Sequence, residues 1–319
     1  MSDALDISLA LDPTPPPSWF TDALAVPEAV DRVEVDGCEI NYIERGGRDA
    51  PHVLLLHGFL AHARCFDMVA PLLVDDLHVV AMDMSGMGDS GHRAGGYQRE
   101  QRVAEVLAVA EATGMTDSPH PWFLVTHSYG STVGIDLFEA HPDAAAGFAV
   151  CDLMFLPPAQ LREHMEESGN RLSEREPRPH QVRPDLETAL SRYRLAPPQP
   201  CENPWAVRHI GFHSLREVEG GYIWKFDPGV ASGDRREPDW WVQLGPRFAS
   251  LDVRRAIVHG ADSLLFTPEA AEYVRDLAGP EVPIIAVPHA HHHLMLDQPV
   301  AFASVVRTIV SSWVAADAA

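Results

Sequence analysis

The chain has 319 residues, of which 46% are hydrophobic and 22% charged, and its formal net charge is −22 at pH 7. This composition is that of a folded globular protein, with enough chain for one large domain or for a core domain that carries an insertion. An acidic surface repels polyanions, so we expect neither nucleic acid nor a membrane as a partner.

Targeting and redox features favour a cytoplasmic protein. Residues 1–17 lack the basic and apolar segments of a signal peptide, and no apolar run approaches the ~20 residues that a membrane helix needs. The four cysteines show no CxxC spacing, and we expect reduced thiols at Cys38, Cys65, Cys151 and Cys201.

Four segments follow one another along the chain. Residues 1–30 form an N-terminal extension, in which prolines at 13 and 15–17 oppose regular structure. Residues 31–152 and 242–319 carry alternating strand and helix patterns and are assigned to a core domain. Residues 153–241 are rich in proline and aromatic residues, and we interpret them as a cap, or lid, inserted into that core.

The core elements are predicted in chain order from turn residues and hydrophobic periodicity. A hairpin is expected over residues 33–35 and 40–43, around the turn dipeptide Asp36-Gly37. Apolar runs then predict buried strands at residues 53–56, 78–82, 122–125, 148–151, 256–258 and 284–287. Helical spacing predicts helices at residues 99–112, 129–140, 268–277 and 300–313. Such alternation favours an α/β fold with a mostly parallel sheet covered by helices on both faces.

The strongest motif is Thr126-His127-Ser128-Tyr129-Gly130, which falls between a predicted strand and a predicted helix. A serine on such a sharp turn presents its hydroxyl at the edge of the sheet, as a nucleophile does. Small residues are needed on both sides of the turn. Gly130 meets that need, whereas Thr126 occupies the position that is usually the first glycine of a G-x-S-x-G turn. A helix N-cap is the alternative role for Ser128.

A second motif, His57-Gly58-Phe59, follows the first central strand. If Ser128 is a nucleophile on such a turn, a loop in this position would supply one backbone N–H to an oxyanion hole, and the residue after the nucleophile would supply the other. We assign Phe59 and Tyr129 to these roles, with Gly58 as an alternative to Phe59. An ordinary turn at the end of the strand remains the other interpretation.

With residues 288–299 (PHAHHHLMLDQP), the chain resembles the α/β-hydrolase superfamily, in which the catalytic histidine precedes an acidic-x-Pro signature. Aligning Asp297 and Pro299 with that signature implies His292 as the catalytic base, and His291 then stands where the family usually has glycine. Residues 83–90 (DMSGMGDS) resemble the family's D-x-x-G-x-G-x-S loop, which implies a structural role for Asp83. The resemblance extends from about residue 33 to residue 313, except for the cap.

A metal site is the alternative use of the histidine cluster, because imidazole is a common metal ligand. The cluster holds His289, His291, His292 and His293, but no matching set of ligands at suitable spacing occurs elsewhere in the sequence. We therefore expect no metal and no cofactor.

Two aspartates compete for the place of the triad acid. The family usually places the acid after the strand at residues 256–258, where this chain has Ser263, with Asp262 one position early. A variation within the family carries the acid at the end of the preceding strand, which here is Asp152. We favour Asp152 and keep Asp262 as the alternative.

The resemblance implies a serine hydrolase that cleaves an ester or lactone through an acyl-enzyme intermediate. Large apolar residues of the cap suggest a bulky apolar substrate, with candidate contacts at Met154, Phe155, Trp205, Tyr222 and Trp224. The chain is also similar overall to bacterial hydrolases that open the macrocyclic lactone of zearalenone. The same triad could instead serve a C–C bond hydrolase, an acyltransferase or a perhydrolase, and a non-catalytic ligand-binding relative is a further alternative. An apolar cap could also form a homodimer contact.

Overall fold

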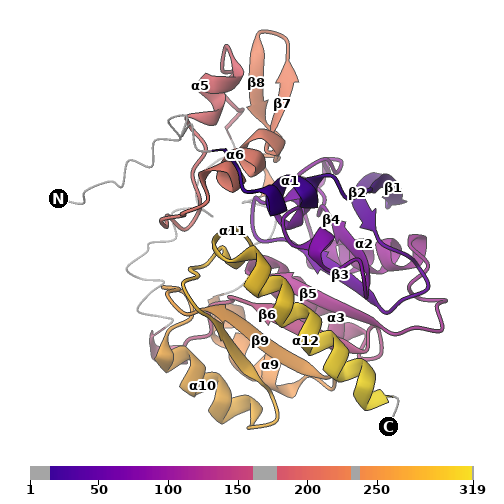
Figure 1. Ribbon diagram of the computed structural model, residues 1–319. Coiled ribbons are helices and arrows are strands. Elements are labelled where there is room, and N and C mark those ends of the chain that lie inside the picture. Colours follow the sequence, from indigo (N-terminus) through magenta and orange to yellow (C-terminus); the bar gives the residue numbers. More distant parts are fainter. Residues whose placement is uncertain (1–14, 161–177, 231–237, 318–319) are drawn as a thin grey trace.

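A sheet of eight strands forms the centre of the protein in the computed structural model, which describes residues 15–160, 178–230 and 238–317 (Figure 1). The strand order is β1-β2-β4-β3-β5-β6-β9-β10, and every pair from β4 to β10 is parallel. The predicted α/β fold with a mostly parallel sheet is confirmed. The strands are β1 (Ala29–Val35), β2 (Cys38–Arg45), β3 (His52–Leu56), β4 (His78–Met82), β5 (Trp122–His127), β6 (Gly147–Cys151), β9 (Arg255–Gly260) and β10 (Ile284–Val287).

The predicted hairpin at the edge of the sheet is present, with β1 antiparallel to β2. Val35 pairs with Cys38, so only Asp36 and Gly37 form the loop, and both have positive φ (48° and 72°). Positive φ at both central residues defines the tight hairpin turn that Asp-Gly favours.

Two apolar layers cover the faces of the sheet, because neighbouring residues of one strand point to opposite sides. Leu54 and Leu56 belong to one layer, while Val53 and Leu55 belong to the other. The first layer includes buried residues of α2 (Arg99–Ala112), α3 (Tyr129–Ala140), α9 (Leu244–Ser250) and α10 (Pro268–Ala278). The second includes those of α1 (Ser18–Leu24), α12 (Pro299–Asp317) and the 3₁₀ helices η1 (Ala63–Phe66) and η2 (Ala70–Leu72).

Helix α12 corrects the expectation that no segment has the dimensions of a membrane helix. Its 19 residues are long and apolar enough to cross a membrane by length and composition alone. In the structure α12 lies across the sheet, where Phe302, Val306 and Val310 are buried (Figure 1). Helices of soluble proteins can meet the same criteria, so length and composition alone are weak evidence that α12 crosses a membrane.

The cap stands at one end of the core and contains its own small sheet (Figure 1). The hydroxyl of Tyr97 donates to Asp227, and the N–H of Asp227 donates to the carbonyl of Gly86 at 2.7 Å, so this segment is tied to the core. The described elements between β6 and β9, apart from α9, are α5 (Leu186–Leu190), α6 (Pro204–His213), β7 (Leu215–Val218), β8 (Gly221–Trp224) and α8 (Pro238–Val242).

The N-terminal segment is more regular than its prolines suggest. Helix α1 begins directly after Pro17, so the prolines precede the helix instead of preventing it. Phe20 of α1 packs against Trp205 of α6 with ring centroids 4.4 Å apart, and Trp19 lies edge-on to the same indole at 5.4 Å. The helix therefore joins the cap to the core.

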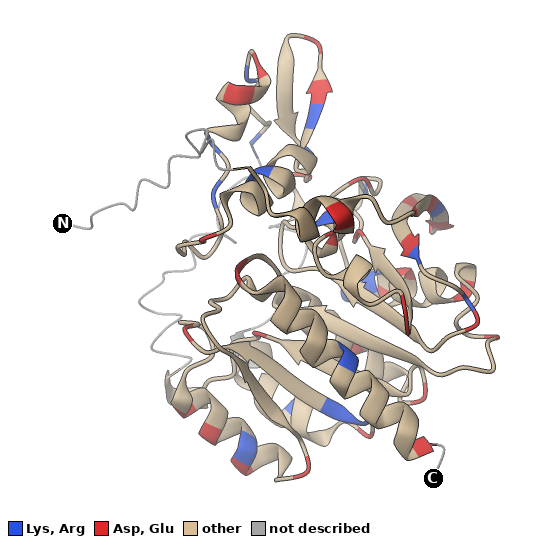
Figure 2. Cartoon of the chain, viewed as in Figure 1, with Lys and Arg blue, Asp and Glu red and all other residues tan. Residues whose placement is uncertain are grey.

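Charged residues lie mainly on the outer elements (Figure 2). Acidic and basic residues share α10 and β7, whereas the central strands carry few charges. This distribution agrees with a buried sheet whose strands are apolar on both faces.

Candidate active site

Ser128 lies on a strained turn between β5 and α3. Its backbone has φ 49° and ψ −121°, and its side chain makes no capping hydrogen bond to α3. A non-glycine residue with positive φ is uncommon and costs about 1–3 kcal/mol, which is typical of functional sites. The N–H of Ser128 donates to the carbonyl of Cys151 at 2.8 Å and so fixes the turn beside the end of β6. The N-cap role has no support in this geometry.

The turn is accommodated by Gly130 and by the hydrogen bonds of Thr126. A Cβ on Gly130 would lie 2.5 Å from the carbonyl oxygen of His57, which is closer than real Cβ atoms come. Thr126 is fully buried, and its hydroxyl donates to Ser131 Oγ at 2.8 Å. The threonine that replaces the family's usual glycine is therefore satisfied within the turn.

His292 and Asp152 form a buried pair. His292 Nδ1 donates to Asp152 Oδ1 at 2.9 Å, although the residues are 140 positions apart in the sequence. Asp152 is completely buried, and it also accepts the N–H of Gly260 on Oδ2 at 2.8 Å and the hydroxyl of Ser263 on Oδ1 at 2.6 Å. A carboxylate with these donors can orient an imidazole and stabilise its charge.

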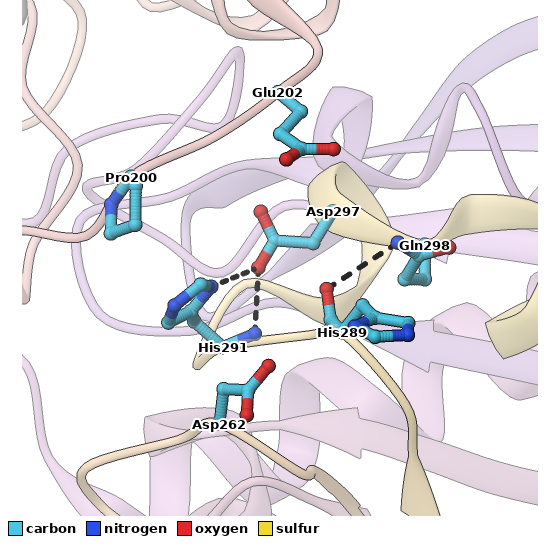
Figure 3. Close-up of a pocket in the computed structure, with 7 residues that line it drawn as sticks. All are labelled: Pro200, Glu202, Asp262, His289, His291, Asp297 and Gln298. Atoms are coloured by element: carbon cyan, nitrogen blue, oxygen red, sulfur yellow. Dashed lines mark hydrogen bonds and ion pairs between the residues drawn. The ribbon is translucent and has the colours of Figure 1, made fainter.

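Asp262, the alternative acid, lies elsewhere. Its N–H donates to the carbonyl of Ala290 at 2.9 Å, and its side chain is exposed. The side chain lines a pocket of about 430 Å³ to which His292 does not contribute (Figure 3). Of the two candidates, the structure brings Asp152 to His292 and leaves Asp262 apart. The pocket is lined by Pro200, Glu202, Asp262, His289, His291, Asp297 and Gln298.

The loop that carries His292 is held by Asp297 and Gln199. Asp297 Oδ2 accepts the N–H of His291 at 2.7 Å (Figure 3). The same oxygen accepts the side-chain amide of Gln199 at 2.9 Å. Gln199 Oε1 in turn accepts the N–H of His293 at 3.0 Å. Asp297, which marked the signature in the sequence, therefore shapes the loop, and Gln199 is a support from the cap segment that the sequence did not reveal.

The expected oxyanion loop lies against the nucleophile turn. A Cβ on Gly58 would be 3.3 Å from Ser128 Cβ, so the backbone of the loop passes directly beside Ser128. The rings of Phe59 and Tyr129 are in edge contact with centroids 5.5 Å apart. Tyr129 is the first residue of α3, where backbone N–H groups point out of the helix. This arrangement suits the roles predicted for Phe59 and Tyr129.

His57 braces that loop and is not a second base. Its Nδ1 donates to the carbonyl of Gly58 at 2.7 Å, and its Nε2 accepts the N–H of Met84 at 3.1 Å. Complete burial lowers the pKa of His57 to about 3. The ring is therefore neutral at physiological pH and acts as a fixed link between two loops.

Asp83 also has the structural role implied by its loop. Its carboxylate accepts hydrogen bonds from the N–H groups of Ala63 and Asp89 and from the amide of Asn41. Burial raises the pKa of Asp83 to about 6. These contacts join η1 to the loop after β4, beside the oxyanion loop.

Four of the five predicted substrate contacts pack against other parts of the protein in this structure. Phe155 is 1% exposed and packs between Phe248 and Phe266, because the chain returns to the core after Asp152. Trp205 packs on α1, as described above. Tyr222 and Trp224 lie on β8 and pack in the apolar cluster of the cap. Met154 is half-buried two residues after Asp152 and remains a candidate.

Comparison with known proteins agrees with the fold. A family model described as the alpha/beta hydrolase family matches residues 53–305. The chain is 30% identical over 136 residues to a haloalkane dehalogenase of Bradyrhizobium diazoefficiens, which is 42% of this chain and 43% of that protein. The chain thus spans less than half the length of that relative.

Two further proteins match over most of their length, one in sequence and one in fold. An esterase of Mycobacterium tuberculosis is 25% identical over 276 residues, covering 84% of this chain and 85% of the esterase. The thioesterase domain from the curacin biosynthetic pathway superposes with a TM-score of 0.72 at 23% identity, covering 88% of this chain and 99% of that domain. With a family match over most of its length, the chain belongs to the alpha/beta hydrolase family.

Proposed function

We propose that the protein is a serine hydrolase that cleaves the ester or lactone bond of a bulky apolar substrate. The observation that carries this proposal is the buried hydrogen bond between Asp152 and His292, at the sheet edge where Ser128 occupies its strained turn. Serine as the nucleophile distinguishes the chain from dehalogenases and epoxide hydrolases of this fold, which use aspartate there.

The proposed reaction assigns a role to each of these residues. Ser128 Oγ attacks the ester carbonyl while His292 Nε2 accepts its proton, and Asp152 stabilises the imidazolium through Nδ1. The backbone N–H groups of Phe59 and Tyr129 bind the oxyanion, each donor contributing about 3–4 kcal/mol by analogy with measured cases. His292 then protonates the leaving alcohol, and in the second step it activates the water that releases the acid.

The substrate class rests on the surroundings of Ser128. Tyr129 follows Ser128 directly and contacts the ring of Phe59, and half-buried Met154 lies two residues after Asp152. We propose that these side chains form apolar walls of the site, in which the aromatic rings offer large, rigid contact surfaces. A large uncharged ester or lactone suits such walls. Zearalenone, a macrocyclic lactone, is the specific candidate we propose from the overall similarity of the sequence.

Active-site labelling combined with a substrate panel tests the proposal. A fluorophosphonate is expected to label the wild type at one serine, and Ser128→Ala is expected to abolish both labelling and hydrolysis. Ser131→Ala is the control, because Ser131 lies three residues after Ser128 in the first turn of α3 and is completely buried, so the label is not expected to reach it. The panel runs from p-nitrophenyl acetate through long-chain esters to zearalenone. Labelling that persists in Ser128→Ala would overturn the proposal.

Product analysis separates the rival functions. Burst release of p-nitrophenol followed by steady turnover with water as acceptor favours an esterase. Transfer to an added alcohol or to peroxide would favour an acyltransferase or perhydrolase, and cleavage of a diketone would favour a C–C hydrolase. Absence of labelling together with tight binding of an apolar ligand would favour a binding protein.

A further inference from the structure

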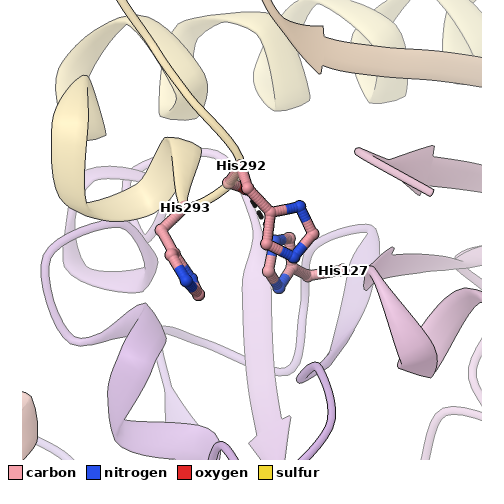
Figure 4. Close-up of side chains that lie close together, drawn as sticks. All are labelled: His127, His292 and His293. Carbon is pink, nitrogen blue, oxygen red and sulfur yellow. Dashed lines mark hydrogen bonds between the residues drawn. The ribbon is translucent and has the colours of Figure 1, made fainter. Parts of the chain in front are cut away.

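Three imidazoles meet beside the nucleophile turn. His127 ends β5, whereas His292 and His293 lie on the loop before α11 (Leu294–Asp297) (Figure 4). One ring nitrogen from each residue lies within 4.8 Å of the other two. The ring centroids are 4.6 Å apart for His127 and His292, 4.9 Å for His292 and His293, and 5.7 Å for His127 and His293.

Each ring already uses one nitrogen as a donor. His127 Nε2 donates to the backbone carbonyl of His292 at 2.8 Å, and His292 Nδ1 donates to Asp152. His293 makes a hydrogen bond to the backbone carbonyl of Ala196, while its Nε2 is buried and has no partner. Each imidazole therefore has one nitrogen whose lone pair is left over: Nδ1 of His127, Nε2 of His292 and Nε2 of His293.

This arrangement is the one found around metal-bound histidines. A ligating imidazole usually donates its other N–H to a carboxylate or a backbone carbonyl, which fixes the tautomer and orients the ring. Here one ring has a carboxylate acceptor and two have carbonyl acceptors. Three imidazole nitrogens suit zinc, copper and nickel, whereas magnesium and calcium prefer oxygen.

We propose that His127, His292 and His293 form a binding site for one transition-metal ion of the zinc class, and that the ion inhibits the enzyme. The ion takes the lone pair of His292 Nε2, which is the nitrogen that would accept the proton of Ser128. A fourth position is left for water. The inhibitory part rests on the proposed role of His292, whereas the binding part does not.

A second group of possible ligands is less suitable. Asp67, His209 and His213 also place ligand atoms within 4.8 Å of one another. However, Asp67 is already paired with Arg45 at 2.7 Å and with Arg64 at 3.4 Å. Two guanidinium groups beside the carboxylate repel a cation, so we assign the metal to the three-imidazole group.

Direct binding is measured with cobalt and zinc on untagged protein. Cobalt(II) is expected to give the intense visible absorption of a four-coordinate site with histidine ligands, and titration calorimetry with zinc is expected to show one strong site. His293→Ala is expected to weaken the affinity at least tenfold. His289→Ala is the matched control, because this histidine of the same loop has an exposed ring outside the three-imidazole group.

His293→Gln keeps a donor for the carbonyl of Ala196, and it decides the outcome if His293→Ala does not fold. Equal affinity of the wild type and of the folded His293 variant for cobalt and zinc would overturn the proposal.

Inhibition is measured in the same proteins with an ester substrate. Micromolar zinc is expected to inhibit the wild type, EDTA is expected to restore activity, and millimolar magnesium is expected to have no effect. His293→Ala is expected to need at least tenfold more zinc for half inhibition, measured relative to the variant's own metal-free activity. If no ester is hydrolysed, the proposed function fails and the cobalt titration still decides on the site. Tight binding of zinc without inhibition would overturn the inhibitory part.

Discussion

Ser263 donates a hydrogen bond of 2.6 Å to the same oxygen of Asp152 that His292 Nδ1 contacts at 2.9 Å. Ser263 occupies the position where the family usually has its acid. The acid and the residue that replaces it are therefore neighbours at the ends of adjacent strands, β6 and β9. We therefore expect a carboxylate at either position to reach the same side of the imidazole.

This relationship predicts that the acid can be moved. Asp152→Asn is expected to lower kcat by about 10³–10⁴-fold, because the amide no longer holds the imidazole tautomer or its charge. The double variant Asp152→Asn with Ser263→Asp is expected to recover at least tenfold of that loss. Asp262→Asn, whose side chain is exposed and lies apart from His292, serves as the control and is expected to keep near wild-type kcat. An inactive Asp262→Asn variant together with an active Asp152→Asn variant would contradict the assignment of Asp152 as the triad acid.

The nucleophile turn predicts a strict requirement for glycine at position 130. A methyl group there would meet the carbonyl oxygens of His57 and Leu56 at 2.5 and 2.8 Å, and backbone atoms cannot move aside cheaply. Gly130→Ala is expected to lower the free energy of unfolding by about 1–3 kcal/mol or more. Gly95→Ala is the control substitution, since no atom lies within 4 Å of a Cβ placed at Gly95. Urea unfolding monitored by tryptophan fluorescence compares the two, and equal stability would refute the crowding argument.

The core could be predicted from the sequence because its strands are apolar on both faces and its helices carry clear periodicity. Strand β4 and helices α2 and α3 have the predicted bounds. Strand β5 runs two residues further than predicted, because Thr126 and His127 are polar but still pair with β6. The hydrophobic pattern of a sequence does not mark polar residues as strand residues. Only their pairing with the neighbouring strand shows that they belong to the sheet.

The site could be predicted where its residues follow strands, and not where distant segments meet. Ser128 and His292 stood out because each lies within a local motif. His127 is 165 positions from His292, so the sequence alone could not predict that the two rings lie side by side. The packing of Phe155 between two core phenylalanines could not be predicted for a related reason, since an aromatic residue in a proline-rich segment can pack inward or face a substrate. Periodicity is lost in irregular segments, and with it the signal for burial.

Buried neutral histidines predict that stability falls on mild acidification. Burial lowers the pKa of His57 to about 3 and that of His52 to about 4, below the value near 6.5 of an unfolded chain. Between these pKa values the unfolded chain binds more protons than the folded protein does, so the free energy of unfolding rises with pH in this range. The protein therefore becomes less stable as the pH falls below about 6.5. Urea midpoints at pH 7.5, 6.5 and 5.5 measure the effect.

A variant away from the active site isolates one histidine. His52 lies at the start of β3, at the end of the strand opposite to the oxyanion loop, and contacts His78 at 2.8 Å. His52→Gln is expected to make the dependence on pH shallower. A stability that stays constant from pH 7.5 to 5.5 in the wild type would contradict the prediction.

Asp67 predicts a second loss of stability at lower pH, located at the contact between cap and core. Burial alone would raise the pKa of Asp67, but the hydrogen bond from His209 of α6 and the charges of Arg45 and Arg64 outweigh it and hold the pKa below its usual value. The contribution of this carboxylate to stability is therefore complete above the unfolded value of about 3.9 and is lost as pH falls through the lower folded value.

Asp67→Asn tests this contact. It leaves buried Arg45 without one of its two carboxylate partners, Glu28 being the other, so the variant is expected to lose about 3 kcal/mol, at the lower end of the range for a broken buried ion pair. Limited proteolysis is expected to cut the cap of the variant faster at pH 7, because His209 loses its charged acceptor. Arg208→Gln serves as the control, because its partner Glu187 is exposed and such surface pairs contribute at most ~1 kcal/mol. Proteolysis of Asp67→Asn at the wild-type rate would show that the cap is held in place without this pair.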